Sequence, residues 1–231
     1  MVMKRWCFFM RFALFAVIMA LVANCPYMAQ AAEEGDYDVI VVGAGTGGVA
    51  AAVQAGRLGA RVALFEETNV LGGQMVTSAV STMDDMYGVR WGIYGEFLDA
   101  ILKHYASLGK SVGTCYWTPI TVAFEPTVAD YVLAQMIKDV RDGKTTRDGK
   151  PGRLDVFFKA KVQKVLKSSD GKSVTGIVAD VNGKKVVCNS KILIDATEYG
   201  DLLPLAGAGY RVGRNVVDGE FSKLDEDARV Q

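Results

Sequence analysis

The feature that most constrains the fold is a glycine-rich hexapeptide placed between an apolar segment and a helical pattern. Tyr37–Val42 is a short, nearly continuous apolar run, which is typical of a strand buried on both faces of a parallel sheet. Residues 43–48 read Gly-Ala-Gly-Thr-Gly-Gly, residues 49–58 favour a helix, and residues 61–66 are again apolar. This order predicts a β-α-β unit, and therefore an α/β fold built on a parallel sheet.

Three glycines of the hexapeptide have separate roles in a dinucleotide site. Gly43 permits the tight strand-to-helix turn, Gly45 lets the backbone approach a pyrophosphate, and Gly48 lets the helix pack closely on the strand. The helix N-terminus offers free N–H groups and a partial positive charge to the phosphates. Glu66 ends the second strand about 20 positions after Gly43, where a carboxylate accepts hydrogen bonds from ribose hydroxyls. The pattern favours an adenine dinucleotide over an ordinary glycine-turned β-α-β unit.

A second glycine pair distinguishes between the dinucleotides. Residues 71–74 read Leu-Gly-Gly-Gln and follow the predicted ribose carboxylate. They would let a second loop run along the pyrophosphate toward a bulkier head group, which a flavin requires. We therefore expect FAD, and NAD stays open as the alternative cofactor. A visible absorption spectrum distinguishes the two cofactors, since a bound flavin absorbs visible light and NAD does not.

With these motifs the chain resembles the FAD-dependent oxidoreductases of the glutathione-reductase-like class. More narrowly, it is similar to a bacterial group of FAD-dependent oxidoreductases that is distantly related to the flavin subunit of heterodisulfide reductase. The resemblance covers most of residues 37–214. Beyond the glycine motifs and Glu66, it rests on residues 124–137, 159–165 and 194–214.

The resemblance implies contacts for further residues. Val162 would touch adenine through its backbone, and the Ala196-Thr197 turn would pass near the cofactor. Asp201 either contacts the cofactor or caps a helix that starts at Leu202, and both interpretations stay open. The predicted FAD-binding residues are Gly43, Gly45, Thr46, Gly47, Gly48, Glu66, Glu67, Gly72, Gly73, Gln74, Val162, Ala196, Thr197 and Asp201.

The resemblance also implies the chemistry. A bound flavin takes a hydride at N5 from a small-molecule substrate, here unidentified, and passes electrons to an unknown partner. The sequence offers no catalytic residue and no metal site. We interpret His104, the only histidine, as a packing or surface residue and not as a proton-transfer group. Residues 113–117, with Arg90 and Trp91, could approach the flavin, but packing in the core or at a domain boundary is the preferred interpretation.

Periodicity predicts the remaining elements. Two amphipathic helices are expected, one with an apolar stripe over residues 97–108 and one after Pro126 with Thr127 as its N-cap. Residues 142–153 predict an exposed loop. Turn dipeptides separate three strands of an antiparallel β-meander, and a parallel strand then returns to the first sheet. These four strands are expected over residues 161–168, 173–181, 184–189 and 191–195.

The first 31 residues have the three-part layout of a secretory signal peptide. Three basic residues lie near the start, residues 12–23 are apolar, and residues 29–31 read Ala-Gln-Ala. The apolar run is roughly 12 residues long, short of the ~20 that span a bilayer. We expect cleavage after Ala31, no stable membrane anchor, and an exported protein of the periplasm or the extracellular space.

Charge and cysteine content narrow the function classes. The chain has 26 basic and 26 acidic residues, and the signal peptide holds three of the basic ones and no acidic one, so the body is mildly acidic. This argues against a nucleic-acid binder, whose phosphate contacts need a basic excess. The body keeps Cys115 and Cys188 with no Cys-x-x-Cys spacing, which predicts no metal site. Two buried thiols or one disulfide remain open.

The expected organisation is a signal peptide over residues 1–31 and an FAD-binding domain over residues 32–231. Residues 74–158 are expected to form a partly helical insertion. In the family the chain goes on to build a substrate domain and to cover the flavin, so the sequence looks like an N-terminal portion. A non-catalytic remnant that holds a dinucleotide, or only the fold, is the alternative from a different class.

Overall fold

The computed structural model describes residues 35–83, 85, 88, 90–115, 118–210, 216–217 and 220–221. The predicted signal peptide lies outside them. The strands are β1 (Gly35–Val42), β2 (Val62–Glu66), β3 (Gly113–Cys115), β4 (Thr118–Ala123), β5 (Leu154–Phe158), β6 (Ala160–Lys167), β7 (Val174–Val181), β8 (Lys184–Asp195), β9 (Val216–Val217) and β10 (Glu220–Phe221). The helices are α2 (Thr46–Arg57), α3 (Gln74–Thr77), α4 (Gly92–Ser107), α5 (Pro126–Arg141) and α6 (Leu202–Ala206).

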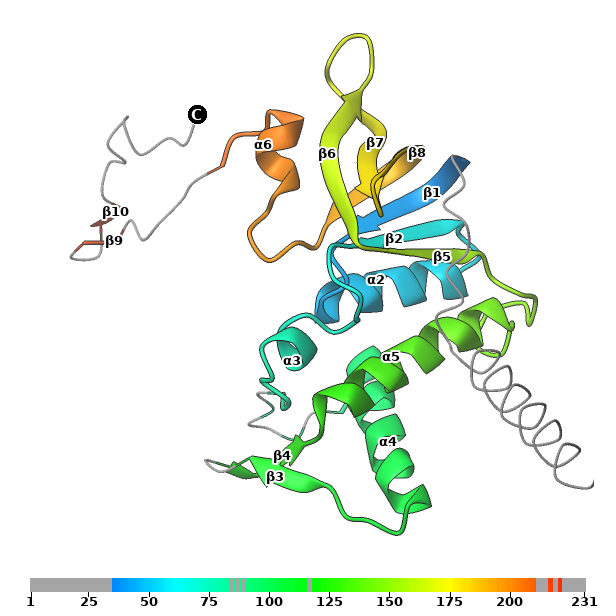
Figure 1. Cartoon of the computed structure of the whole chain (residues 1–231), viewed down its shortest axis with the longest axis vertical. Coiled ribbons are helices and arrows are strands. Elements are labelled where there is room, and N and C mark those ends of the chain that lie inside the picture. The colour runs from blue at the N-terminus through cyan, green and yellow to red at the C-terminus, as the bar shows by residue number, and fades with distance from the viewer. Residues whose placement is uncertain are drawn as a thin grey trace, which may run out of the picture.

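A six-stranded sheet with the order β5-β2-β1-β8-β7-β6 forms the centre (Figure 1). β1 pairs in parallel with β2 and β8, and β2 pairs in parallel with β5. β6, β7 and β8 pair in antiparallel fashion, as the predicted meander requires. The predicted α/β class, with a Rossmann-like parallel core and an antiparallel meander, is confirmed.

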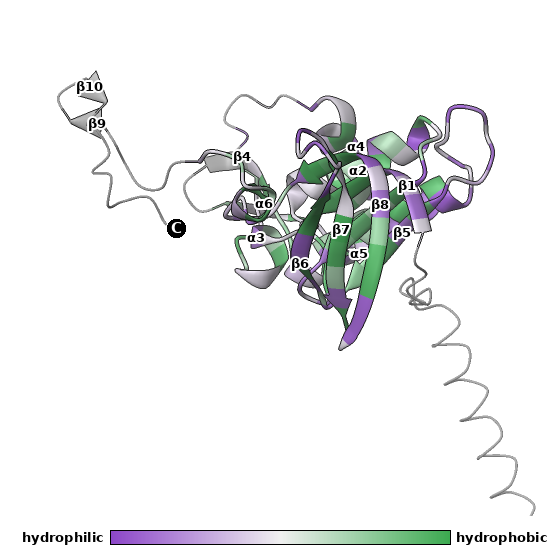
Figure 2. Cartoon of the chain, turned by 90° about the horizontal axis from the view of Figure 1, so that it is seen from above, coloured by the Kyte–Doolittle hydropathy of each residue, from purple (hydrophilic) through white to green (hydrophobic). Residues whose placement is uncertain are grey.

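Alternate residues of the parallel strands enter two different cores. Val39 and Val41 of β1 pack with α2, α4 and α5, whereas Ile40 and Val42 pack toward the meander and α6. Because successive side chains of a strand point to opposite faces, only a continuous apolar run satisfies both cores. Figure 2 shows apolar colouring concentrated in the strands and helices of this centre.

β8 corrects one prediction. Two strands were expected over residues 184–189 and 191–195, but the structure has a single strand. Its first half pairs with β7, and residues 188–195 pair with β1. Asn189 and Ser190 interrupt the apolar pattern where the strand passes from one partner to the other, which made one strand look like two.

Two more predictions need correction. Pro126 is the first residue of α5 and Glu125 occupies the N-cap position, so the expected cap at Thr127 is wrong. The fixed φ of proline suits the first helical position, which explains the earlier start.

β5 was not predicted as a strand, since Asp155 interrupts a short apolar segment. β5 lies in the range 74–158, together with α3, α4, α5 and the β3-β4 pair, and it joins the main sheet.

A cluster of polar side chains lies at the amino ends of the parallel strands. The Tyr37 hydroxyl donates to Asp155 Oδ2 at 3.0 Å, and Arg153 Nε donates to the same oxygen at 3.3 Å. The Arg61 guanidinium lies 4.7 Å from the centre of the Tyr37 ring. Burial, reinforced by the Asp155 carboxylate, raises the pKa of the Tyr37 hydroxyl well above its ordinary value.

Two further observations bear on the sequence predictions. Cys115 and Cys188 are both buried and are not joined in the disulfide that the sequence left open. Among the described residues, no helix combines the length and the apolar character that a membrane span needs.

Candidate functional site

Two adjoining cavities lie at the carboxyl ends of β1, β2 and β8. The first has a volume of about 210 Å³ and the second about 540 Å³. They share the wall residues Gly45, Ala196, Thr197 and Glu198. The carboxyl edge of an open α/β sheet is where such folds bind ligands.

The structure brings all the predicted FAD-binding residues to these cavities. The first cavity is lined by Gly43, Gly45, Glu66, Glu67, Gly73, Val162, Ala196, Thr197 and Asp201, and the second by Gly45, Thr46, Gly47, Gly48, Gly72, Gln74, Ala196 and Thr197. Their contact with a cofactor stays a prediction.

The three motif glycines differ in what a side chain would meet. A Cβ on Gly43, whose φ is +95°, would lie 2.3 Å from the Ala196 carbonyl oxygen. A Cβ on Gly48 would lie 1.8 Å from the Gly43 carbonyl oxygen. A Cβ on Gly45 would have no atom within 4 Å. Gly43 and Gly48 therefore serve backbone packing, while Gly45 faces open space at the wall of both cavities.

The N-terminus of α2 is directed at this open space. Gly45 is its N-cap residue and makes no side-chain cap hydrogen bond, and the first turn holds no acidic residue. The first N–H groups of a helix have no partner within the helix. Such a terminus binds anions through these donors and the helix dipole.

Glu66 links the end of β2 to the glycine turn. Its Oε2 accepts a hydrogen bond from the Ala44 N–H at 2.7 Å, and its Oε1 accepts one from the Thr68 N–H at 2.8 Å. Each carboxylate oxygen has two lone pairs, so both can accept a further bond from a hydroxyl. Thr68 also lines the first cavity, and the sequence analysis did not identify it. The neighbouring Glu67 lies 4.0 Å from Lys161 in an exposed ion pair.

The second glycine pair folds onto the first glycine turn. The Gly72 N–H donates to the Ala44 carbonyl at 2.8 Å. Gly72 and Gly73 have φ values of +104° and +50°, which favour glycine. A Cβ on Gly73 would lie 3.0 Å from the Gly45 Cα. The two glycine loops thus approach each other closely enough to contact one ligand together.

Val162 reaches the first cavity from β6, the edge strand of the sheet. Val162 pairs with Ala179 and Lys164 pairs with Val178, so Gln163 is an extra residue in β6. Such a bulge interrupts the ladder locally and is common beside binding sites. The backbone around Val162 thus lies at the first cavity, and its contact with adenine stays a prediction.

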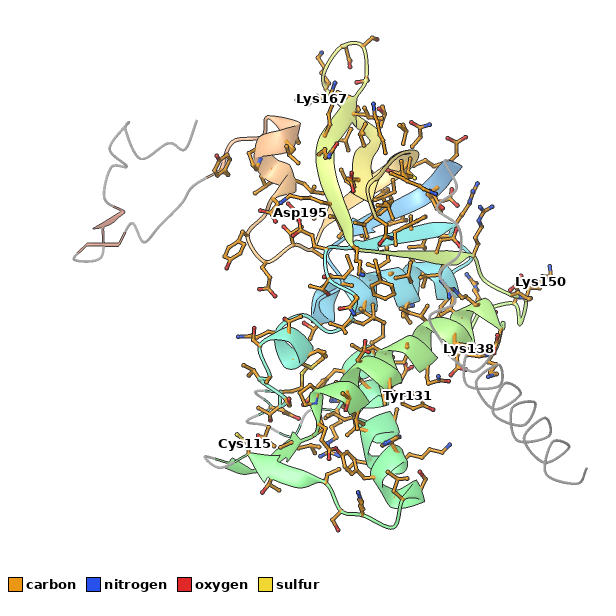
Figure 3. All side chains as sticks on the ribbon, in the orientation of Figure 1. Cys115, Tyr131, Lys138, Lys150, Lys167 and Asp195 are labelled. Atoms are coloured by element: carbon orange, nitrogen blue, oxygen red, sulfur yellow. The ribbon has the colours of Figure 1, made fainter. Side chains whose placement is uncertain are left out.

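The loop after β8 depends on Asp195, which the sequence analysis did not select. Asp195 Oδ1 accepts hydrogen bonds from the Thr197 N–H at 3.1 Å and from Thr197 Oγ1 at 2.7 Å. Its Oδ2 accepts from the Leu202 N–H at 3.0 Å. Asp201 occupies the N-cap position of α6, which begins at Leu202 as expected, but its side chain makes no cap hydrogen bond. Figure 3 labels Asp195 where β8 leaves the sheet toward α6.

The cavities are acidic. Their described lining residues include five carboxylates and neither lysine, arginine nor histidine. The carboxylates belong to Glu66, Glu67, Asp195, Glu198 and Asp201. A bound phosphate would therefore depend on backbone N–H groups. In the part of the chain that the structure describes, no three metal-ligating side chains cluster.

The other sequence candidates lie elsewhere. His104 lies in α4 with its ring centre 5.5 Å from that of Tyr131, outside both cavities, as the packing interpretation predicts. Trp91 is 79% exposed and lines neither cavity. Residues 113–115 form β3, away from both cavities, and residues 116–117 lie outside the described residues.

Comparison with known proteins identifies the family. Residues 38–225 match the model of the FAD dependent oxidoreductase family. The chain belongs to this family. Sarcosine oxidase subunit alpha of Corynebacterium sp. (strain U-96) is 32% identical over 103 residues, which are 45% of this chain and 10% of that protein.

Solved structures share the fold. THI4 of Thermovibrio ammonificans superposes with a TM-score of 0.51 and 20% identity, covering 87% of this chain and 70% of that one. A geranylgeranyl bacteriochlorophyll reductase-like protein of Thermoplasma acidophilum has the same TM-score and identity, with 75% of this chain and 42% of that one covered. The chain thus spans only a tenth of its curated relative and less than half of the second structure.

Proposed function

We propose that the chain binds FAD across the two cavities, and that the protein is an FAD-dependent oxidoreductase acting on a small molecule. Family membership supports the cofactor class. The observation that carries the proposal is Gly45, whose missing side chain leaves open space at the N-terminus of α2, between both cavities. A pyrophosphate placed there would accept hydrogen bonds from the N–H groups at the start of α2, and its two ends would extend into the two cavities.

The first cavity suits the adenosine half. Glu66 lies at the end of β2 with lone pairs free for ribose hydroxyls, and the bulged edge around Val162 lies on the same cavity. The second cavity is larger and is lined by Gly72 and Gln74 of the second glycine loop, so we assign it to the flavin half. When bound, a flavin supplies hydride chemistry at N5, while the residues of this chain bind and orient it.

The direct test is the visible spectrum of the purified chain after FAD is added and unbound FAD is removed. We expect a bound flavin spectrum and a higher melting temperature with FAD, because a ligand that binds only the folded state stabilises it. A colourless protein whose melting temperature rises with NAD would support the NAD alternative. A protein that responds to neither would support the non-catalytic remnant.

Gly45→Val tests the pyrophosphate position. A Cβ at this position has no protein atom within 4 Å, and Gly45 has an extended conformation with φ −63° and ψ −176°, so the fold should be retained. The side chain would occupy phosphate space, and we expect FAD affinity to fall at least about 100-fold, as for a lost set of charge-assisted bonds. Gly209→Val is a matched control, because Gly209 also has open space but lines neither cavity. Flavin retained by Gly45→Val would contradict the assignment.

We also propose that residues 1–31 direct export and are then removed, which places the protein in the periplasm or outside the cell. The three-part layout of these residues supports this. N-terminal sequencing of the protein from the extracytoplasmic fraction should begin at Ala32. Val17→Arg, which interrupts the apolar run, should leave the uncleaved chain in the cytoplasm. A small-molecule substrate and a separate electron partner, without nucleic acid, complete the proposal.

A further inference from the structure

We propose that Asp195 is a positioning residue for the dinucleotide, because its carboxylate fixes the loop of residues 196–201 as the wall common to both cavities. This inference rests on the proposed function, since it concerns how that site holds its cofactor. Asp195 does so by accepting hydrogen bonds from the loop it precedes and from the first residue of α6.

The hydrogen bonds show what the carboxylate does. Oδ1 accepts hydrogen bonds from both the N–H and the hydroxyl of Thr197. These two bonds occupy both lone pairs of Oδ1. Oδ2 accepts the Leu202 N–H, seven residues along the chain. Thr197 Oγ1 in turn accepts the Asp201 N–H at 2.8 Å, so the same group extends across the loop. One carboxylate therefore ties together the start and the end of the loop.

The start of the loop lies directly on the glycine turn. The Ala196 N–H donates to the Val42 carbonyl at 2.8 Å. The Ala196 carbonyl occupies the space that a Cβ on Gly43 would need, and the Ala196 methyl group would lie 3.1 Å from a Cβ on Gly48. A displacement of Ala196 would thus change the space above the glycine turn, where we place the pyrophosphate.

The outer part of the loop has little other support. Tyr199 is 91% exposed, and Glu198 is also exposed. An exposed loop without its anchoring bonds samples many conformations, and only a fraction of them present the binding wall. Affinity falls in proportion to that fraction. Asp195 therefore acts on the cofactor through the population of the correct loop conformation.

The test is FAD affinity in Asp195→Ala, measured by quenching of flavin fluorescence, with circular dichroism as the check on the fold. We expect the dissociation constant to rise about 10- to 100-fold, as for a loop that is competent about 1 to 10% of the time. Asp195→Asn keeps one acceptor oxygen and should give a smaller rise. It also carries the test if the alanine variant does not fold.

Asp170→Ala is the matched control. Asp170 Oδ1 accepts from Ser168 Oγ at 2.5 Å and from the Lys172 N–H at 3.1 Å, so this carboxylate also organises an exposed loop. It lies in the β6-β7 turn and lines neither cavity. Its loss should leave FAD affinity unchanged. An equal loss of affinity in the Asp170 and Asp195 variants would overturn the proposal.

A double-mutant cycle with Thr197→Val separates positioning from direct contact. If Asp195 and Thr197 act as one unit, the double variant should bind FAD no more weakly than Asp195→Ala alone. Multiplicative losses would show two independent ligands and would overturn the proposal, as would wild-type affinity in both Asp195 variants. Failure of the wild-type chain to bind FAD would instead refute the proposed function.

Discussion

The two ends of the parallel strands are built in different ways. At the amino ends, side chains are paired with one another: Tyr37 with Asp155, and Lys191 Nζ with Asp38 Oδ1 at 2.7 Å. At the carboxyl ends, glycine backbone packs on backbone, and the polar side chains bond to main-chain groups of the loops. The carboxyl ends also surround the two cavities.

The difference indicates how the strands divide stability and binding. At the amino ends, the Asp155 and Asp38 carboxylates accept hydrogen bonds from side chains of the protein itself. At the carboxyl ends, the first N–H groups of α2 lack a side-chain cap. The Glu66 and Asp195 carboxylates there accept hydrogen bonds from backbone N–H groups of the loops. Substitutions at the amino ends should therefore change folding alone. Substitutions at the carboxyl ends should change binding, and also folding where backbone packs on backbone.

The largest effect is expected for Gly48→Ala, where packing and binding coincide. The new methyl group would lie 1.8 Å from the Gly43 carbonyl oxygen, so the backbone must move. We expect a loss of about 3 kcal/mol in the free energy of unfolding, at the upper end for overpacking. Urea unfolding of the purified chain measures it.

Gly47→Ala is the control for folding. It lies in the same helical turn, but a Cβ there meets nothing within 4 Å. Alanine favours helix over glycine by about 1 kcal/mol, so this variant should be as stable as the wild type or more so. Equal stability of the Gly47 and Gly48 variants would show that the backbone contact is not decisive.

The same contrast explains which parts of the site the sequence could predict. The first glycine loop was predictable, because the order of strand, Gly-x-Gly-x-x-Gly and helix is a local sequence pattern. The strand pattern of β1 was predictable from its continuous apolar run. Glu66 was found from its spacing to Gly43, since that spacing reflects the length of one β-α-β unit.

Features that depend on contacts between distant segments were not predictable. β5 was missed because an aspartate such as Asp155 is typical of a loop. Its place in a strand depends on the hydrogen bond from Tyr37, which is distant in the sequence. The continuity of β8 depends on its change of partner from β7 to β1. Asp195 was missed because its bonds exist only once the loop is folded. For Asp201, the residue before α6, the sequence left cofactor contact and helix capping equally open.

An intermediate effect, on folding alone, is expected for Tyr37→Phe. The buried Asp155 carboxylate would lose the hydrogen bond from the Tyr37 hydroxyl and keep the one from Arg153 Nε. We expect a loss of about 2 kcal/mol in the free energy of unfolding, as for a hydrogen bond to a charged group. FAD affinity should not change, since Tyr37 lies at the other end of β1 from the cavities.

The pH dependence of stability provides a second measurement on Tyr37. Burial raises the pKa of the folded Tyr37 hydroxyl above its ordinary value of 10.0. Above pH 10 the unfolded chain therefore releases a proton that the folded chain retains, and the wild type loses stability as the pH rises. The stability gap between wild type and Tyr37→Phe should narrow above pH 10. A constant gap would contradict the buried hydroxyl.

The smallest effect, on binding alone, is expected for Glu198→Gln. Glu198 is exposed and lines both cavities, where the described residues supply no cation to offset its charge. Because the pyrophosphate of FAD is negative, removing this carboxylate should tighten binding about 2- to 5-fold at low salt, the size of an exposed charge interaction. Salt screens such interactions, so the gain should disappear near 1 M salt. Asp99→Asn removes an equal charge from the exposed face of α4 and should leave affinity unchanged. Weaker binding by Glu198→Gln would mean that this carboxylate accepts a hydrogen bond from the cofactor.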